Sequence, residues 1–151
     1  MRQRALANSL TAAFVVFTLL VTACSSSTSA SENGLSAART RWSQLAPASY
    51  RYTIFRSCEC VAAMSGPVIV SVRNGGVESR TYAQSGSAVT QYADLFPTVD
   101  GLFAMIDTAV RSGSSRIEAD YDATFGFPTF IAIGNPSVDA PVYTVTDFHA
   151  Q

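Results

Sequence analysis

The order of helical and strand periodicities along the chain constrains the fold more than any other feature. A first apolar stripe with helical spacing is formed by Leu35, Ala38, Trp42 and Leu45. Pro47 closes this segment, and Pro97-Thr98 opens a second one. The second, cleaner stripe is formed by Val99, Leu102, Phe103, Ile106, Ala109 and Val110. These spacings predict two amphipathic helices, near 35–45 and 99–110.

Three strand-like segments follow each predicted helix. After the first helix, alternation at Tyr50, Tyr52 and Ile54 predicts a strand that continues toward Cys58 and Cys60. Valines at 68, 70 and 72 predict a second strand, and Asn74-Gly75 is a favoured hairpin turn into a third at 77–82. A loop near 84–89 and a short turn or helical piece at 92–96 lead to the second helix. The remaining strands are expected at 116–121, 129–133 and 143–148.

This element order predicts an α+β fold. We expect an antiparallel sheet of about five to six strands packed against two helices, in the order α-β-β-β-α-β-β-β. Strands and helices do not alternate singly, which disfavours a parallel doubly wound sheet.

The first 23 residues have the three parts of a secretory signal peptide. Arg2 and Arg4 precede an apolar run that ends at Val21, and the small residue Ala23 stands just before Cys24. The run is shorter than the roughly 20 residues that a membrane-spanning helix needs. We therefore expect residues 1–23 to be removed, which leaves one globular domain at 35–151 behind a flexible Ser/Thr-rich tether at 24–34.

Val21-Thr22-Ala23-Cys24 resembles the lipobox of bacterial lipoproteins. The resemblance implies a diacylglyceryl group on Cys24, further acylation such as palmitate, and a mature chain that begins there. Two acyl chains suffice for stable anchoring. The expected location is the cell membrane or the outer membrane, lipid-anchored and facing the extracytoplasmic space. Ordinary secretion with a free Cys24 is the alternative.

The charge of the chain argues against nucleic acid as a partner. All ten basic residues are arginine, and removal of Arg2 and Arg4 leaves eight against eleven acidic residues. No basic patch or run is present to neutralise phosphates.

Several short motifs are spread over nearly the whole mature domain: Trp42, Ser49-Tyr50-Arg51-Tyr52, Cys58-Glu59-Cys60, Val70-x-Val72-x-Asn74-Gly75, Leu95-Phe96, Leu102-Phe103-x-x-Ile106 and Tyr121-Asp122-x-x-x-Gly126-Phe127-Pro128. Together they resemble the DUF6174 family of bacterial envelope proteins, whose function is uncharacterised. The sequence departs from the pattern at Gly134-Asn135, where an aspartate is expected. The resemblance implies a location and a fold but no activity.

Cys58 and Cys60 share one face of the predicted strand, so both sulfurs point the same way. With Cys24 lipidated, these two thiols form an even pair in an oxidising compartment, and a local disulfide is the leading interpretation. Two unpaired core thiols are one alternative. Thiol exchange or capture of a soft ion such as Cu(I) is another, with Met64 as a possible third ligand.

Two other groups of residues are candidate catalytic or metal-binding sites. Glu118, Asp120 and Asp122 alternate along one strand, which is typical of a solvated outer face and less so of a calcium site or of a glycosidase acid–base pair. Asp147-x-His149 holds the only histidine, next to the chain end, a poor place for a catalytic triad. No catalysis, metal or cofactor is therefore expected.

The sequence thus predicts a non-catalytic binding or structural module, with redox or Cu(I) handling by Cys58 and Cys60 as the alternative. Its expected partner is another envelope protein, docked on the exposed sheet face or on an aromatic loop. The binding candidates in and before this loop are Tyr121, Asp122, Gly126, Phe127 and Pro128.

Overall fold

The computed structural model describes residues 27–134 and 140–151. The first half contains helix α1 (Ser27–Leu45), β1 (Ser49–Ser57), the short helix α2 (Ala62–Ser65), β2 (Val68–Arg73) and β3 (Gly76–Tyr82). The second half contains the 3-10 turn η1 (Ala93–Leu95), α3 (Val99–Arg111), β4 (Ile117–Tyr121), β5 (Pro128–Ile133) and β6 (Val142–Ala150). The predicted α+β class, both main helices and all six strands are confirmed.

The strands form one antiparallel sheet in the order β3-β2-β1-β6-β5-β4. Each half of the chain is a three-stranded meander, and the halves meet where β1 pairs with β6. The C-terminal strand therefore lies in the middle of the sheet.

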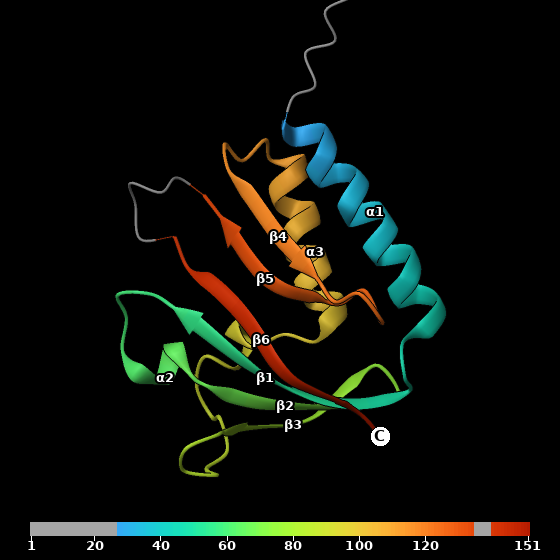
Figure 1. The fold of residues 1–151 in the computed structure, drawn as a ribbon. Helices are drawn as coiled ribbons and strands as arrows, with labels where there is room; N and C mark the ends of the chain where they lie inside the picture. The colour runs from blue at the N-terminus through green and yellow to red at the C-terminus, as the bar shows by residue number, and fades with distance from the viewer. Residues whose placement is uncertain (1–26, 135–139) are drawn as a thin grey trace, which may run out of the picture.

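One face of the sheet is packed and the other is open. In Figure 1, α3 lies behind β4 and β5 and α1 runs beside β4, whereas no described helix crosses the face toward the viewer. Along β1, Tyr50, Tyr52 and Ile54 are buried, whereas Arg51 between the first two and Phe55 after the third are exposed. This is the alternation expected of an antiparallel sheet with a single core face.

Hydrogen bonds tie the start of α3 to β1. The hydroxyl of Tyr52 donates to the carbonyl of Pro97, and the hydroxyl of Tyr50 accepts from the amide of Val99 at 3.3 Å. Burial raises the pKa of Tyr50 to about 12 and raises that of Tyr52 further. The N-terminus of α3 is therefore fixed relative to the sheet by two buried phenols.

An aromatic cluster joins α1 to the C-terminal strand. Its members are Trp42, Tyr50, Phe125, Phe127 and Phe148. Phe127 and Phe148 stack with ring centroids 4.4 Å apart. A bulge in the β1–β6 pairing, with Asp147 at φ 50°, interrupts the strand alternation just before Phe148 and lets its ring join the cluster.

Helix α1 begins earlier than the sequence predicts. Leu35, Ala38 and Trp42 are buried as expected, but the helix starts at Ser27, so residues 27–34 are helical rather than a flexible tether. Once packed turns around Ala38 and Trp42 have formed, each further residue adds one hydrogen bond at little cost. Residues 24–26, the remainder of the predicted tether, lie outside the described residues.

Candidate functional site

An apolar groove lies beside α3, between that helix and strands β5 and β6. Its volume is about 610 Å³, within the range of roughly 300–1,000 Å³ that is usual for ligand sites. Its apolar and aromatic lining residues, with one glycine, are Pro97, Gly101, Ala104, Met105, Ala109, Ile131, Ile133, Pro141 and Tyr143.

The sequence of α3 creates one wall of the groove. The helix turns its larger apolar residues, such as Leu102 and Ile106, toward the sheet, where both are fully buried. Gly101 and Ala104 then lie on the flank of the helix, and their small size leaves space open. A Cβ at Gly101 would lie 2.6 Å from Cβ of Pro97, so glycine allows the preceding loop to approach the helix.

The sheet supplies the floor, and polar residues stand at both ends of α3. Ile131 and Tyr143 are buried floor residues, 1% and 6% exposed. Asp94 lies near the start of α3, and Ser112 and Ser114 lie near its end. Among the described lining residues, Asp94 alone carries a charge. The groove is therefore apolar along its length except at Thr108, and it is acidic at one end.

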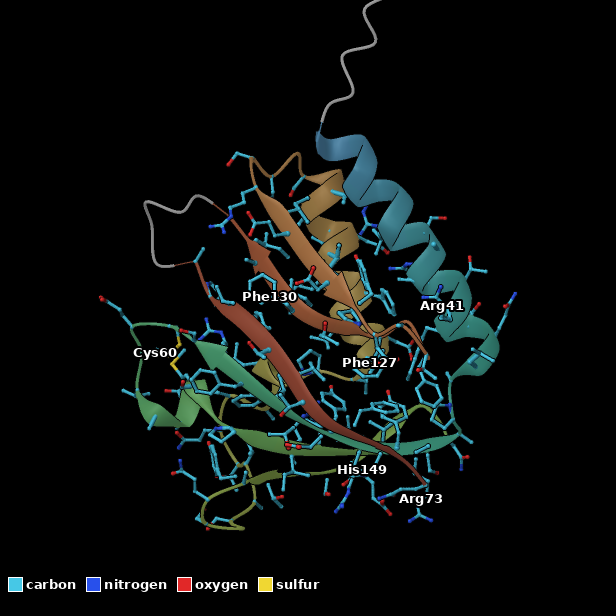
Figure 2. The ribbon with its side chains drawn as sticks, viewed as in Figure 1. Arg41, Cys60, Arg73, Phe127, Phe130 and His149 are labelled. Atoms are coloured by element: carbon cyan, nitrogen blue, oxygen red, sulfur yellow. A yellow bond between two sulfur atoms is a disulfide. The ribbon has the colours of Figure 1, made fainter. Side chains whose placement is uncertain are left out.

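The second candidate site is the cysteine pair, which Figure 2 shows at the end of β1 beside α2. Cys58 and Cys60 lie at disulfide distance with their Cα atoms 5.3 Å apart. Nη1 of Arg56 lies 2.9 Å from Sγ of Cys58 and 3.6 Å from Sγ of Cys60. A guanidinium therefore contacts both sulfurs, and this contact did not figure in the sequence analysis.

The predicted binding residues lie together near the β4–β5 turn, where most of them pack against other parts of the protein. Asp122 Oδ1 accepts hydrogen bonds from the amides of Thr124 and Phe125 at 2.9 and 2.6 Å. Phe127 is 5% exposed and Pro128 is fully buried. Tyr121 stacks on the ring of Phe103, with centroids 6.2 Å apart.

Gly126 in the same turn has φ +85°, and a Cβ there would lie 2.4 Å from the carbonyl oxygen of Ala38 in α1. The turn is thus pressed against α1. A binding role for this segment stays a prediction. The side chains of Phe127 and Pro128 expose little surface to solvent.

The three acidic residues in and just after β4 lie in two environments. Glu118 and Asp120 are exposed, and a hydrogen-bonded pair with Arg116 lowers the pKa of the Glu118 carboxyl. Asp122 instead caps the turn that follows the strand. Ile117, Ala119 and Tyr121 pack against the core, as the alternation predicts.

His149 pairs with Arg51 across β1 and β6 and lines a hollow of about 280 Å³ together with Asp147. Within residues 27–134 and 140–151, no group of three or more His, Cys, Asp or Glu side chains is placed to hold a metal ion.

The predicted signal peptide and the lipidation site Cys24 lie outside the described residues. In the part of the chain that the structure does describe, no helix is long and apolar enough to cross a membrane.

The two sites differ in how far the sequence could have revealed them. Arg56 stands two residues before Cys58, so the predicted strand, which continues toward Cys60, already places both on one face, although β1 ends at Ser57. The groove residues come from separate segments, and no local pattern links Pro97 or Ala104 to Ile131 and Tyr143.

A family model described as "Family of unknown function (DUF6174)" matches residues 34–150. No curated protein and no solved structure matches the chain significantly.

Proposed function

The chain belongs to the DUF6174 family, whose function is unknown, and from this premise we propose that it is a lipid-anchored binding module of the bacterial envelope. Its site is the groove beside α3, and its occupant is an apolar polypeptide segment of another envelope protein. The observation that carries the proposal is a groove of about 610 Å³ whose lining is apolar except near the ends of α3 and at Thr108.

The dimensions of the groove fit a short segment of chain. Helix α3 has 13 residues, which at about 1.5 Å each gives a length of about 20 Å. Six extended residues span about the same distance. Apolar side chains of such a segment would pack on Met105 and Ile131. The hydroxyls of Thr108 and Ser112 donate to the carbonyls of Ala104 and Ala109, so their oxygens would accept hydrogen bonds from backbone amides of the segment.

The charge at one end of the groove favours a particular composition of the bound polypeptide segment. Asp94 stands near the N-terminal end of α3, and no described lining residue is basic. A basic residue at one end of the segment gains from this carboxylate, whereas an acidic one is repelled.

The location belongs to the same proposal. Cys24 precedes the first residue of α1 closely in the sequence, so a diacylglyceryl group there would hold the domain near the membrane surface. We assign the anchor to the cell membrane or outer membrane and the domain to the extracytoplasmic side.

Binding rather than catalysis fits the chemistry of the groove. Its polar side chains are the carboxylate Asp94 and hydroxyls such as Thr108, Ser112 and Ser114. No histidine, lysine or cysteine stands among the described lining residues to activate a hydroxyl as a nucleophile.

A defined peptide tests this function. The probe is a fluorescein-labelled hexapeptide of one lysine followed by alternating valine and leucine, titrated with the purified chain in a polarisation assay. Ala104→Phe fills the groove from an exposed helix position and should weaken binding at least about tenfold, or 1.4 kcal/mol. The matched control is Ala37→Phe, exposed on α1 and outside the groove, which should change the affinity by less than about twofold.

Two results would overturn the proposal. The first is equal binding of the peptide by wild type and by Ala104→Phe. The second is saturable binding of a single-chain lysophospholipid in the groove with no binding of the peptide, since the occupant would then be a lipid.

A further inference from the structure

We propose that Cys58 and Cys60 form a thiol–disulfide exchange site that oxidises thiols of extended polypeptides. In this site Arg56 stabilises the thiolate of Cys58 as the leaving group when a partner thiolate attacks Cys60. The site lies at the end of β1, and none of its three residues lines the groove beside α3, so it does not depend on the proposed binding function.

The distances distinguish the two sulfurs. Nη1 of Arg56 is 2.9 Å from Sγ of Cys58 but 3.6 Å from Sγ of Cys60. A nearby cation favours the thiolate over the thiol, and the thiol of lower pKa is the better leaving group in disulfide exchange. The bond should therefore open with Cys60 as the attacked sulfur.

The guanidinium is held in place by neighbours other than the cysteines. Nε of Arg56 donates to the hydroxyl of Tyr143 at 3.2 Å, and its Cζ lies 5.9 Å from the centroid of that ring. The backbone of Arg56 is held separately, because the hydroxyl of Ser65 in α2 donates to its carbonyl at 2.8 Å. Within the described part of the chain, no carboxylate forms an ion pair with Arg56, so its charge is available to the sulfurs.

The surroundings suit an extended, apolar substrate. Cys58 and Cys60 are half-buried, and Glu59 between them is exposed. Phe55 and Val61 flank the pair in the sequence and are 41% and 61% exposed. Exposed apolar side chains beside a reachable disulfide favour unfolded chains, whose own apolar residues are still uncovered.

The exchange balances within the two reactants. A partner thiolate attacks Sγ of Cys60, the bond between Cys58 and Cys60 breaks, and its electron pair leaves on Cys58 beside Arg56. The second partner thiol, deprotonated by water, then attacks the partner sulfur of the mixed disulfide and releases Cys60. The partner dithiol loses two electrons and becomes a disulfide, while the cysteine pair gains them and takes up two protons from solvent.

The first test is the rate at which glutathione opens the pair in a chain carrying Cys24→Ser, followed by alkylation and intact mass. Arg56→Met should slow the opening roughly fivefold, because the departing thiolate of Cys58 then lacks a neighbouring cation. Arg51→Met is the matched control on the same strand, where the exposed Arg51 alternates with buried residues, and should leave the rate unchanged. An equal rate in wild type and Arg56→Met would overturn the proposal.

A second test leaves Arg56 intact, so it does not depend on how well that variant folds. In a chain that also carries Cys24→Ser, Cys60→Ser leaves only Cys58, and Cys58→Ser leaves only Cys60. At pH 7, Cys58 should react with iodoacetamide at least about threefold faster than Cys60, because more of it is thiolate. A faster Cys60 would contradict the assigned roles.

A third measurement addresses the substrate. The oxidised chain is mixed with a reduced synthetic peptide that carries two cysteines next to leucine residues, and peptide disulfide is quantified. The expected result is one peptide disulfide for each Cys58–Cys60 pair reduced. No peptide oxidation would overturn the exchange activity and would leave the groove proposal intact.

Discussion

The indole Nε1 of Trp42 donates a hydrogen bond to Oδ1 of Asp100 across 3.1 Å and so joins α1 to the first turn of α3. Trp42 is 4% exposed, so its N–H has little access to water. Asp100 also lies where the helix dipole favours a negative charge. One carboxylate therefore stabilises both the contact between the two helices and the helix that borders the groove.

Removal of this carboxylate should destabilise the protein. Asp100→Ala leaves the buried indole N–H without a partner and should lower the free energy of unfolding by about 1–2 kcal/mol. Urea denaturation measures the change. Asp120→Ala, on the exposed side of β4, is the control and should stay within about 0.5 kcal/mol of wild type. Equal effects of the two substitutions would show that the Trp42 contact contributes nothing.

The close contact between α1 and the turn before β5 can be tested by substitution. Gly126→Ala meets both an unfavourable φ of +85° and the carbonyl oxygen of Ala38 at 2.4 Å, and should cost about 3 kcal/mol or more. Gly75→Ala is the matched control, because φ there is +76° but nothing lies within 4 Å of the new Cβ. Its cost should be about 1 kcal/mol, from the backbone alone. Thermal unfolding of both variants separates the two contributions, and equal losses would refute the contact with α1.

Alkaline pH should unfold the protein through its buried tyrosines. The pKa of Tyr50 is raised by burial to about 12 in the folded protein, against about 10 in the unfolded chain. Below pH 10 both states are protonated and the full stability is present. Between pH 10 and 12 the unfolded state loses the proton first, so the free energy of unfolding falls by about 1.4 kcal/mol per pH unit for this group.

Urea denaturation at pH 9, 10 and 11 measures that slope, and Tyr50→Phe should make it shallower. Appearance of all tyrosinate absorbance near pH 10, with no loss of folded protein, would contradict the raised pKa values of Tyr50 and Tyr52.

The anchor is tested by a single substitution. Cys24→Ser removes the sulfur proposed to carry the lipid, so the protein should move from the membrane fraction to the soluble fraction and lose incorporation of labelled palmitate. Cys58→Ser serves as the control and should stay in the membrane fraction. Retention of Cys24→Ser at the membrane would refute the lipid anchor.

Local patterns predicted most of the fold. The stripe of α3 and the Asn74-Gly75 hairpin depend on neighbours in sequence, and both were predicted correctly. The pairing of β1 with β6 was not predicted, because the register between distant strands is set by packing of the whole core rather than by any short motif. The start of α1 was missed because polar residues continue a helix that is stabilised farther along.

The candidate sites were less accessible to sequence reasoning. The Gly126-Phe127-Pro128 motif was a predicted binding candidate, and that role stays a prediction; in the folded chain Phe127 stacks on Phe148. The sequence pattern of aromatic residues next to a turn is the same whether their side chains face solvent or the core. Only the tertiary structure shows which way they face. The groove is open because the side chains of Gly101 and Ala104 are small. Small residues in a sequence do not indicate a groove until the residues packed around them are known.

Methyl NMR of the chain with the lysine-led hexapeptide tests the central claim most directly. Methyl groups of Met105, Ile131 and Ile133 report on the groove, while Ile69 lies on the open face of the sheet, next to buried Val68 and Val70 in β2. The account predicts saturable shifts of the three groove methyls, with Ile69 unchanged and all shifts lost in Ala104→Phe. Shifts at Ile69 with the groove methyls unmoved would place the partner on the open sheet face and contradict the account.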